Sequence, residues 1–265
     1  MILGDNVKAV ILAGGLGTRL SEETSLKPKP MVEIGNKPIL WHIMKILSSH
    51  GIQEFIICCG YKGSIIKEYF ENYSLLKEDV MFNLKNKTSQ VLSDNHSENW
   101  SVLCVETGEN TLTGGRIKKI KKYLNPGEPF LLTYGDGVGN IDVTKLVKFH
   151  NNHKKLATVT AVNPPSRFGV LSIQDDGLVE SFSEKPKGGS AWINGGFFIL
   201  DPSSIDFIET DMTAWEDQPV KKISEMGQMH AYKHDGFWQP MDTLNEKNYL
   251  NELYLKNQAP WVNWK

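Results

Sequence analysis

Short apolar runs and helical patterns alternate along the first half of the chain. Residues 7–12 (VKAVIL) and 55–59 (FIICC) are almost entirely apolar and are followed closely by glycine, which is typical of buried strands. Residues 38–50 and 64–73 carry apolar side chains at the spacing of one helix face. The order strand, helix, strand, helix favours a mostly parallel sheet with helices on both faces.

The pattern continues through the rest of the chain, with more strands in its second part. Further strands are expected at residues 100–105, 130–134, 156–162, 169–173, 178–183 and 192–200, and further helices at 115–123, 142–150, 204–210, 220–226 and 244–256. Asp142 is placed to cap the helix that follows it. We see no repeat and no long linker, so the 265 residues fit one large α/β domain.

Two segments outside this regular pattern admit two interpretations each. Residues 83–99 are polar and poor in aromatic side chains, which indicates either a surface loop or a mobile flap beside a site. Trp261 and Trp264 pack either on their own domain or in an interface between subunits, because exposed tryptophan is costly.

The overall charge and composition exclude several classes of function. The formal net charge is −2, so no general attraction to nucleic acid or to an anionic membrane is expected. No run approaches the roughly 20 apolar residues of a membrane span, and the first residues lack the basic segment of a signal peptide. Three cysteines without a C-x-x-C pair fit a reduced, cytoplasmic protein.

One stretch combines bare backbone with positive charge. Three glycines within residues 14–17 precede Arg19, and Lys29 follows between two prolines. Ligands of parallel sheets bind at the carboxyl ends of strands, where glycine lets backbone N–H groups approach a negative group closely, and this suits a triphosphate. The stretch is neither a P-loop nor the dinucleotide fingerprint, because no Lys-Ser or Lys-Thr follows and Leu20 stands in place of the third glycine.

The stretch AGGLGTRL (13–20) followed by KPKP (27–30) resembles the signature of the nucleotide-sugar pyrophosphorylases, nucleotidyltransferases that join a sugar 1-phosphate to a nucleotide. Further motifs similar to that family are TYGDG (133–137), SEKP (183–186) and INGGFFIL (193–200). The likeness runs from about Lys8 to Trp264 and weakens between about 74 and 99. It implies a Rossmann-like nucleotidyltransferase fold, with a mostly parallel central sheet flanked by helices. A nucleotide-binding part would span about 7–165 and a smaller, mixed sugar-binding part about 166–265.

The resemblance also implies a reaction. The segments at 20–45, 55–63, 113–119, 184–189 and 236–244 are similar to family members that use CTP and α-D-glucose 1-phosphate and form CDP-glucose and pyrophosphate. The sugar phosphate would attack the α-phosphorus in line, with Mg²⁺ as cofactor and no general base, because a phosphate monoester is already mostly dianionic at neutral pH. The residues leave three alternatives open: another nucleotide or sugar 1-phosphate, a glycosyltransferase, or an inactive nucleotide-sugar-binding protein.

The resemblance implies two sets of ligand-binding residues and a metal pair. The nucleotide is expected to contact Leu12, Ala13, Gly14, Gly15, Gly17, Thr18, Arg19, Lys29, Thr111, Gly115, Arg116 and Gly135. The sugar phosphate is expected to contact Tyr134, Glu184, Lys185, Asn194, Gly195 and Trp238, and Mg²⁺ to bind Asp136 and Asp242. The expected catalytic residues are Arg19, which would hold the leaving pyrophosphate, and Lys29, which would reach the α-phosphate.

Several of these assignments have a purely structural alternative. Lys27 is a weaker candidate than Lys29, Arg116 is also compatible with a solvated charge, and Asp136 with a simple turn residue. The histidines and cysteines form no zinc pattern. The resembling family is oligomeric, so we expect a homo-oligomer, with a hexamer as one arrangement, and no nucleic acid or membrane partner.

Overall fold

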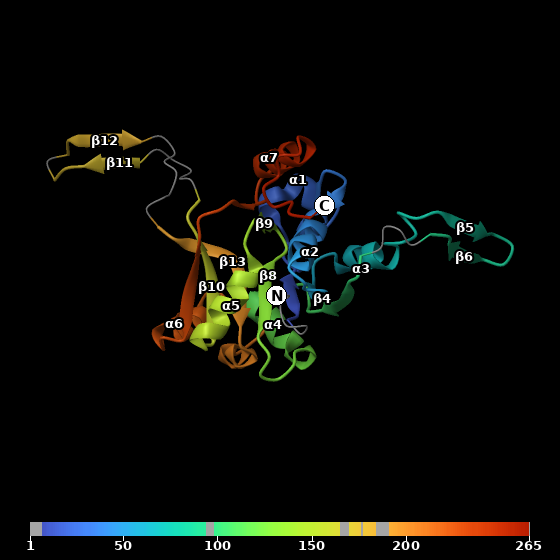
Figure 1. Ribbon diagram of the computed structural model, residues 1–265, viewed down its shortest axis with the longest axis horizontal. Coiled ribbons are helices and arrows are strands. Elements are labelled where there is room, and N and C mark those ends of the chain that lie inside the picture. The colour runs from blue at the N-terminus through green and yellow to red at the C-terminus, as the bar shows by residue number, and fades with distance from the viewer. Residues whose placement is uncertain (1–6, 94–97, 165–169, 176, 184–190, 265) are drawn as a thin grey trace.

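Seven strands form one central sheet in the computed structural model, which describes residues 7–93, 98–164, 170–175, 177–183 and 191–264 (Figure 1). The strands are β1 (Ala9–Leu12), β4 (Glu54–Cys59), β7 (Ser101–Glu106), β8 (Phe130–Tyr134), β10 (Ala157–Val162), β13 (Ile193–Leu200) and β14 (Met229–His234). Their order is β14-β10-β13-β8-β1-β4-β7. β13 pairs antiparallel with β10 and β8, and the other neighbours pair in parallel. The prediction of a mostly parallel sheet is therefore confirmed.

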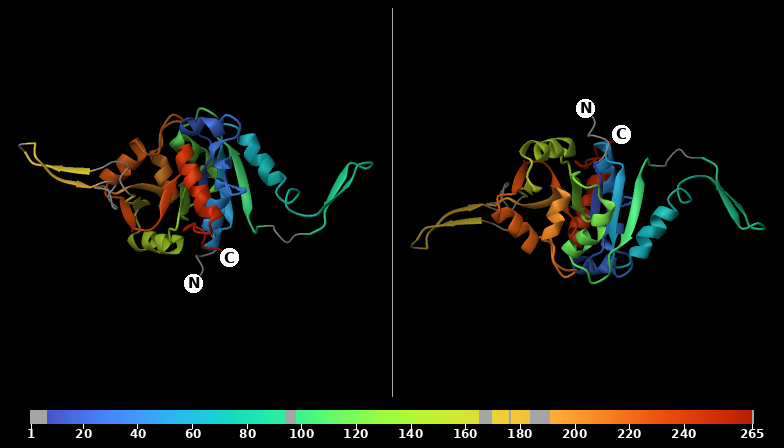
Figure 2. Two further views of the ribbon diagram at one scale, coloured as in Figure 1. Left: turned by 90° about the horizontal axis from the view of Figure 1, so that it is seen from above. Right: turned by 90° about the horizontal axis from the view of Figure 1, so that it is seen from below.

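Helices cover both faces of this sheet (Figure 2). One face carries α2 (Ile39–Ser49), α3 (Gly63–Glu71), α5 (Val143–His153) and α7 (Leu244–Leu255). The other face carries α4 (Thr113–Ile120), α6 (Gln218–Glu225) and the 3₁₀ helix η4 (Pro202–Phe207). Asp142 accepts a hydrogen bond from the backbone of Lys145 and so caps α5 as expected. No helix in the described ranges is both long and apolar enough to cross a bilayer.

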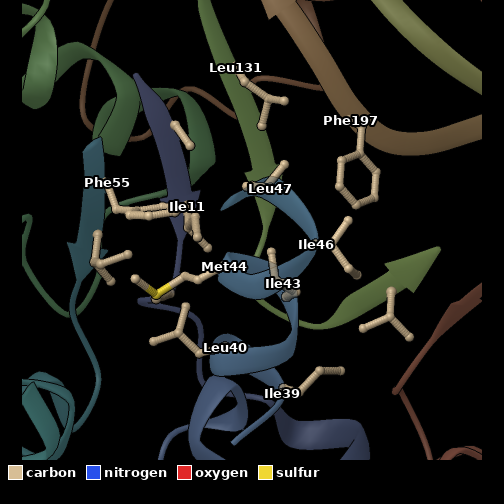
Figure 3. Close-up of a cluster of buried hydrophobic side chains, with 14 of the residues drawn as sticks. Ile11, Ile39, Leu40, Ile43, Met44, Ile46, Leu47, Phe55, Leu131 and Phe197 are labelled. Atoms are coloured by element: carbon tan, nitrogen blue, oxygen red, sulfur yellow. The ribbon is translucent and has the colours of Figure 1, made fainter. Parts of the chain in front are cut away.

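The side chains of β1 show why the sheet must be covered on both faces. Ala9 and Ile11 belong to the core on one face, whereas Val10 and Leu12 belong to the core on the other. Helix α2 fills the first core: Leu40 and Met44 lie toward Ile11 and Phe55, and Ile46 lies toward Phe197 (Figure 3). A strand that is buried on both faces has no polar positions, which is why residues 9–12 are recognisable in the sequence.

Two hairpins extend from opposite sides of the body, and we call them the two arms (Figure 1). One arm pairs β5 (Val80–Asn83) with β6 (Thr88–Val91), and the other pairs β11 (Val170–Ile173) with β12 (Val179–Ser183). Of the two interpretations of residues 83–99, the surface loop is wrong for the first part, because residues 80–91 form a regular hairpin, and the mobile flap stays a prediction. Its turn includes a bond from the backbone of Asn86 to the side chain of Asn83. Both faces of this hairpin are largely exposed, so its strands lack the apolar alternation that marks a half-buried strand.

Other departures from the sequence prediction are short or weakly patterned. Residues 204–210 were expected to be helical, and the structure has the 3₁₀ helix η4 there. Strand β14 was not anticipated, because its sequence MHAYKH alternates poorly and lies at the edge of the sheet. Two very short strand pairings were also missed: β2 (Glu33–Ile34) with β3 (Lys37–Pro38), and β9 (Gly137–Gly139) with β15 (Trp238–Pro240), which matters for the site.

The C-terminal residues pack on their own domain. Trp261 is fully buried, and its ring stacks on Phe237 at 5.6 Å between centroids. Its indole nitrogen lies 3.4 Å from Nδ1 of His42. Trp264 is half-buried against Trp41 and His42. Of the two interpretations of this segment, the structure bears out packing within the domain for Trp261.

Two buried histidines remain neutral inside the fold. Burial lowers the pKa of His42 to about 4, and burial together with the neighbouring His153 lowers the pKa of His150 to about 4. Nε2 of His42 lies 3.0 Å from the carbonyl oxygen of Ile34, and Nδ1 faces the indole N–H of Trp261. A neutral ring with its proton on Nε2 satisfies both contacts, whereas a second proton on Nδ1 would face another donor.

Acid is expected to destabilise the protein between pH 6.5 and about pH 4. The unfolded chain takes up protons at these histidines below pH 6.5, whereas the folded chain does so only near pH 4. The free energy of unfolding therefore falls as the pH falls through this window. By pH 5 the loss is expected to be about 2 kcal/mol for each histidine. Urea unfolding at pH 7 and pH 5 measures it, and His150→Gln should reduce the difference. Equal free energies for the parent protein at both pH values would contradict the prediction.

Candidate active site

A glycine-rich turn at the carboxyl end of β1 forms one wall of a pocket of about 320 Å³. The turn runs from Ala13 to Gly17 and leads into the 3₁₀ helix η1 (Thr18–Leu20). Gly17 has φ 65°, which favours glycine, and its carbonyl accepts a bond from the hydroxyl of Thr24. The pocket lies where β1 ends between β4 and β8, as the position of ligands in parallel sheets predicts.

The structure brings most of the residues expected to bind nucleotide together around this pocket. Its lining includes Leu12, Ala13, Gly14, Gly15, Gly17, Thr18, Arg19, Lys29, Thr111, Arg116 and Gly135, and also Pro30, Leu112, Thr113, Tyr134 and Asp136. Gly115 is not part of the lining, because it is buried against the backbone of Asp211, 2.4 Å from where a Cβ would lie. Gly115 instead lets the loop at 211–216 approach the start of α4 closely.

Arg116 is buried and stabilises the glycine-rich turn through a hydrogen bond to the carbonyl oxygen of Gly14. Its guanidinium donates hydrogen bonds to the carbonyl oxygens of Gly14, Cys59, Gly108 and Glu109 and to the hydroxyl of Thr107. Both terminal nitrogens are therefore engaged with protein acceptors. The alternative of a solvated charge does not apply to Arg116, since only 4% of it is exposed. In this structure the side chain positions the turn that forms the pocket wall.

Gly14→Ala is expected to lower the melting temperature by about 4 °C or more, because a Cβ would lie 2.1 Å from Nη1 of Arg116 and displace several of its hydrogen bonds. Gly15→Ala is the matched control for stability, since nothing lies within 4 Å of a Cβ at that position. Thermal melts of the two variants measure the difference. Identical melting temperatures would show that Arg116 does not hold the turn as described.

Lys29, Arg19, Asp136 and Asp242 form a cluster at one side of the pocket, which we call the charge cluster. Nζ of Lys29 lies 2.7 Å from Oδ2 of Asp136 and 2.5 Å from Oδ1 of Asp242, and Nη1 of Arg19 lies 2.7 Å from Oδ2 of Asp242. Lys29 and Asp242 are buried, whereas the Arg19 side chain is largely exposed. Lys27 pairs instead with Glu33 at 3.3 Å and does not line the pocket.

The pairing of β9 with β15 explains why two aspartates 106 residues apart in the chain lie together. Asp136 comes directly before β9, and Asp242 lies two residues after the end of β15, with Met241 between them. The backbone N–H of Met241 donates to the carbonyl of Asp136 at 2.8 Å, which fixes the two chains side by side. The resemblance predicted this meeting, and the two short strands are its physical cause.

The two carboxylates hold Lys29 as a cation. Burial by itself would lower the pKa of the ammonium, but the charges and hydrogen bonds of Asp136 and Asp242 outweigh it, so that the pKa lies above its ordinary value. Lys29 therefore carries a full positive charge at neutral pH.

Asp136 and Asp242 have the chemistry that Mg²⁺ requires, because both present carboxylate oxygens to one position. No third histidine, cysteine or carboxylate among the described residues joins a group that could hold a metal. Mg²⁺ is usually held by one or two carboxylates together with substrate phosphates, so the pair fits a metal that is shared with a nucleotide.

Three residues expected to bind the sugar phosphate, Asn194, Gly195 and Trp238, gather beside a fourth, Tyr134, at the end of β8. The side-chain nitrogen of Asn194 lies 3.4 Å from the hydroxyl of Tyr134, and Tyr134 packs against Gly196. The indole N–H of Trp238 donates to the carbonyl of Gly195 at 2.7 Å. Glu184 and Lys185 lie outside the described residues.

Sequence reasoning missed a bridge on the outer side of this group. Glu216 accepts hydrogen bonds from the hydroxyl of Tyr134 and from that of Thr113, and Thr113 in turn accepts one from the backbone of Trp215. The bridge joins the start of α4 to the end of β8. Glu216 lies in an irregular loop with no motif around it, so no sequence signal marks it.

This arrangement of sheet, pocket and charge cluster matches a known class of enzyme. Residues 8–250 match the family described as nucleotidyl transferase, and the chain belongs to that family. It is 56% identical over 259 residues to the glucose-1-phosphate cytidylyltransferase of Salmonella typhi, covering 98% of this chain and 100% of the relative. The probable glucose-1-phosphate cytidylyltransferase of Bacillus subtilis is 43% identical over 259 residues, with 97% and 100% covered.

Solved structures share the fold. HddC from Yersinia pseudotuberculosis superposes with a TM-score of 0.69 at 27% identity, covering 94% of this chain and 99% of the other. UDP-glucose pyrophosphorylase complexed with UDP-glucose gives 0.68 at 16% identity, covering 95% and 99%. The expected Rossmann-like nucleotidyltransferase fold is confirmed.

Proposed function

We propose that the protein transfers a cytidylyl group from CTP to α-D-glucose 1-phosphate and forms CDP-glucose and pyrophosphate. The observation that carries this proposal is the charge cluster beside a glycine-walled pocket, which offers two cations to phosphates and two carboxylates to a metal. The choice of base and sugar rests on the name of the relative that is 56% identical over almost the whole chain.

In this proposal the protein works by placing two anions that repel each other. The backbone of residues 13–17 surrounds the triphosphate, Arg19 holds the departing pyrophosphate, and Lys29 stabilises the charge at the α-phosphate. The sugar phosphate oxygen attacks the α-phosphorus and the bond to the β-phosphate bridging oxygen breaks, so that no protein base is needed. Asp136 and Asp242 would hold Mg²⁺, which neutralises phosphate charge when it is bound.

The sugar phosphate would lie beside Tyr134, Asn194, Gly195 and Trp238, with Glu184 and Lys185 completing its site. Burial, followed by the charge of Glu216, raises the pKa of Tyr134, so its hydroxyl stays protonated and donates to Glu216. Tyr134 can then accept a hydrogen bond from a sugar hydroxyl in place of the long bond that it accepts from Asn194. Glu216 would position Tyr134 for this contact.

We also propose that the protein is cytoplasmic and forms a homo-oligomer, with a hexamer as one arrangement. The two arms expose apolar side chains, among them Met81, Phe82, Val179 and Phe182, which a second copy could cover. Cys58, Cys59 and Cys104 are all free thiols, as is usual in a reducing compartment. Light scattering of the purified protein tests the assembly, and a monomer at all concentrations would contradict it.

The function is tested by measuring pyrophosphate release with Mg²⁺ and glucose 1-phosphate, offering CTP, UTP, dTTP, ATP and GTP in parallel. We expect release with CTP and a product with the mass of CDP-glucose. Release with another nucleotide would keep the chemistry and overturn the base. Release of nucleoside diphosphate in place of pyrophosphate would indicate a glycosyltransferase, and binding without release would indicate an inactive binding protein.

A further inference from the structure

The charge cluster contains equal numbers of cations and carboxylates, and they already satisfy one another. Lys29 bridges Asp136 and Asp242, and Arg19 takes the second oxygen of Asp242. The two cations are those expected to bind phosphate, and the two carboxylates are those expected to bind metal. Each group is thus paired with a partner that it would have to leave in order to act.

The ammonium of Lys29 lies at the position that a metal shared by the two carboxylates would take. Its distances of 2.7 and 2.5 Å leave no room for a cation between Nζ and the carboxylate oxygens. A Mg²⁺ ion that arrived alone would have to displace this ammonium, and no third histidine, cysteine, aspartate or glutamate of the described residues joins the two carboxylates to hold it. Magnesium binds weakly to so few protein ligands when no phosphate is present.

A triphosphate changes the pairing within the charge cluster. Its oxygens offer new partners to the two cations, and its bound metal offers a new partner to the two carboxylates. Lys29 and Arg19 both line the pocket, so phosphate oxygens placed there can replace the carboxylates as their partners. The released carboxylates can then share a metal with the same phosphates. All four groups exchange partners in one event, and none is left buried without an opposite charge.

We propose that Lys29 occupies the metal position of the free protein and keeps it closed until nucleotide and metal arrive together. Metal and nucleotide then enhance each other's binding to the protein, in addition to the affinity of the metal for the nucleotide itself. The extra coupling equals the free energy needed to break the ion pairs within the charge cluster, because this cost is met once when both ligands bind together. The proposal rests on the proposed function for the kind of nucleotide, but the position of Lys29 does not depend on which base is used.

The test measures Mn²⁺ binding to the nucleotide-free protein by electron paramagnetic resonance of the unbound ion. The unaltered protein should bind Mn²⁺ weakly, and Lys29→Met should bind it about tenfold more tightly or better, because the competing charge is gone. Lys27→Met removes the same charge two residues away, where Lys27 pairs with Glu33, and should leave Mn²⁺ binding as in the unaltered protein. Lys29→Arg keeps a cation at the position and should also bind weakly.

Equal Mn²⁺ affinities for Lys29→Met and Lys27→Met would overturn the proposal, since a general change in charge would then account for both. Circular dichroism establishes that each variant is folded before binding is compared. If Lys29→Met does not fold, Arg19→Met replaces it, because the exposed Arg19 contributes little to stability. It should tighten Mn²⁺ binding about threefold by freeing one oxygen of Asp242, and unchanged binding would contradict the proposal. No CTP or sugar is used, so a wrong base assignment leaves this test unaffected.

Discussion

Lys29→Ala is expected to lower turnover by about two to three orders of magnitude, because under the proposed function the variant loses the buried cation that would face the reacting phosphate. In the free protein Asp136 and Asp242 hold the ammonium as a cation, and Lys29 is only 7% exposed, so its charge is already placed beside the pocket when nucleotide binds. The effect should fall on kcat more than on KM, since charge on the phosphates grows in the transition state.

Lys27→Ala is the matched control for this experiment. Lys27 forms a surface pair with Glu33 and does not line the pocket, so its removal should leave turnover within about twofold. Pyrophosphate release under saturating substrates measures both variants. Comparable turnover in Lys29→Ala and Lys27→Ala would remove Lys29 from the reaction.

The stability of Lys29→Ala is expected to fall as well. Judged from charge alone, the substitution would leave the fold intact, but Lys29 is only 7% exposed and separates two carboxylates. Removing one member of a buried ion pair leaves the others without compensation, although Arg19 still neutralises Asp242. Turnover should therefore be compared at a temperature at which circular dichroism shows both variants to be folded.

Trp261→Ala is expected to destabilise the protein by about 3–5 kcal/mol, because it removes a fully buried indole from the packing with Phe237 and His42. For a chain of this size the loss corresponds to a melting temperature about 6–15 °C lower. Phe237 directly precedes β15, the strand that leads to Asp242. Because Trp261 packs on Phe237, it also helps to fix the backbone that carries Asp242.

Trp264→Ala is the comparison within the same segment. Trp264 is only half-buried, so its removal should cost clearly less than the removal of Trp261. Urea unfolding of both variants gives the two free energies. Equal and small losses would mean that the C-terminal segment is not anchored by Trp261 as the structure has it.

The sequence predicts best the elements that are buried by a regular pattern. β1 and α2 are recognisable because one is apolar at every position and the other is apolar on one face. β14 and the β5–β6 arm have no such pattern, since an edge strand and a free hairpin bury little. The local pattern of residues predicts that β13 is a strand, but it does not indicate that β13 lies between β8 and β10 in the sheet.

The candidate site divides in a similar way. The glycine turn and Lys29 belong to one continuous stretch, so their chemistry is visible as a motif. Asp136 and Asp242 meet through strands of three residues each, which no periodicity can predict. The bridge from Glu216 to Thr113 and Tyr134 depends on the course of an irregular loop, and the role of Arg116 depends on carbonyl groups from four different positions.

The place of β13 has a consequence for how the chain folds during synthesis. β10 pairs only with β13 and β14 within the sheet, and both are made after it. While the ribosome is still adding residues beyond 165, β8 has an open edge and β10 has no neighbour, so the nascent sheet remains incomplete until β13 arrives. Residues 7–165 are therefore not expected to fold as a separate unit. The boundary near residue 165 that the sequence predicts between two ligand-binding parts would not separate two folding units, because β13 joins β8 to β10 in one sheet.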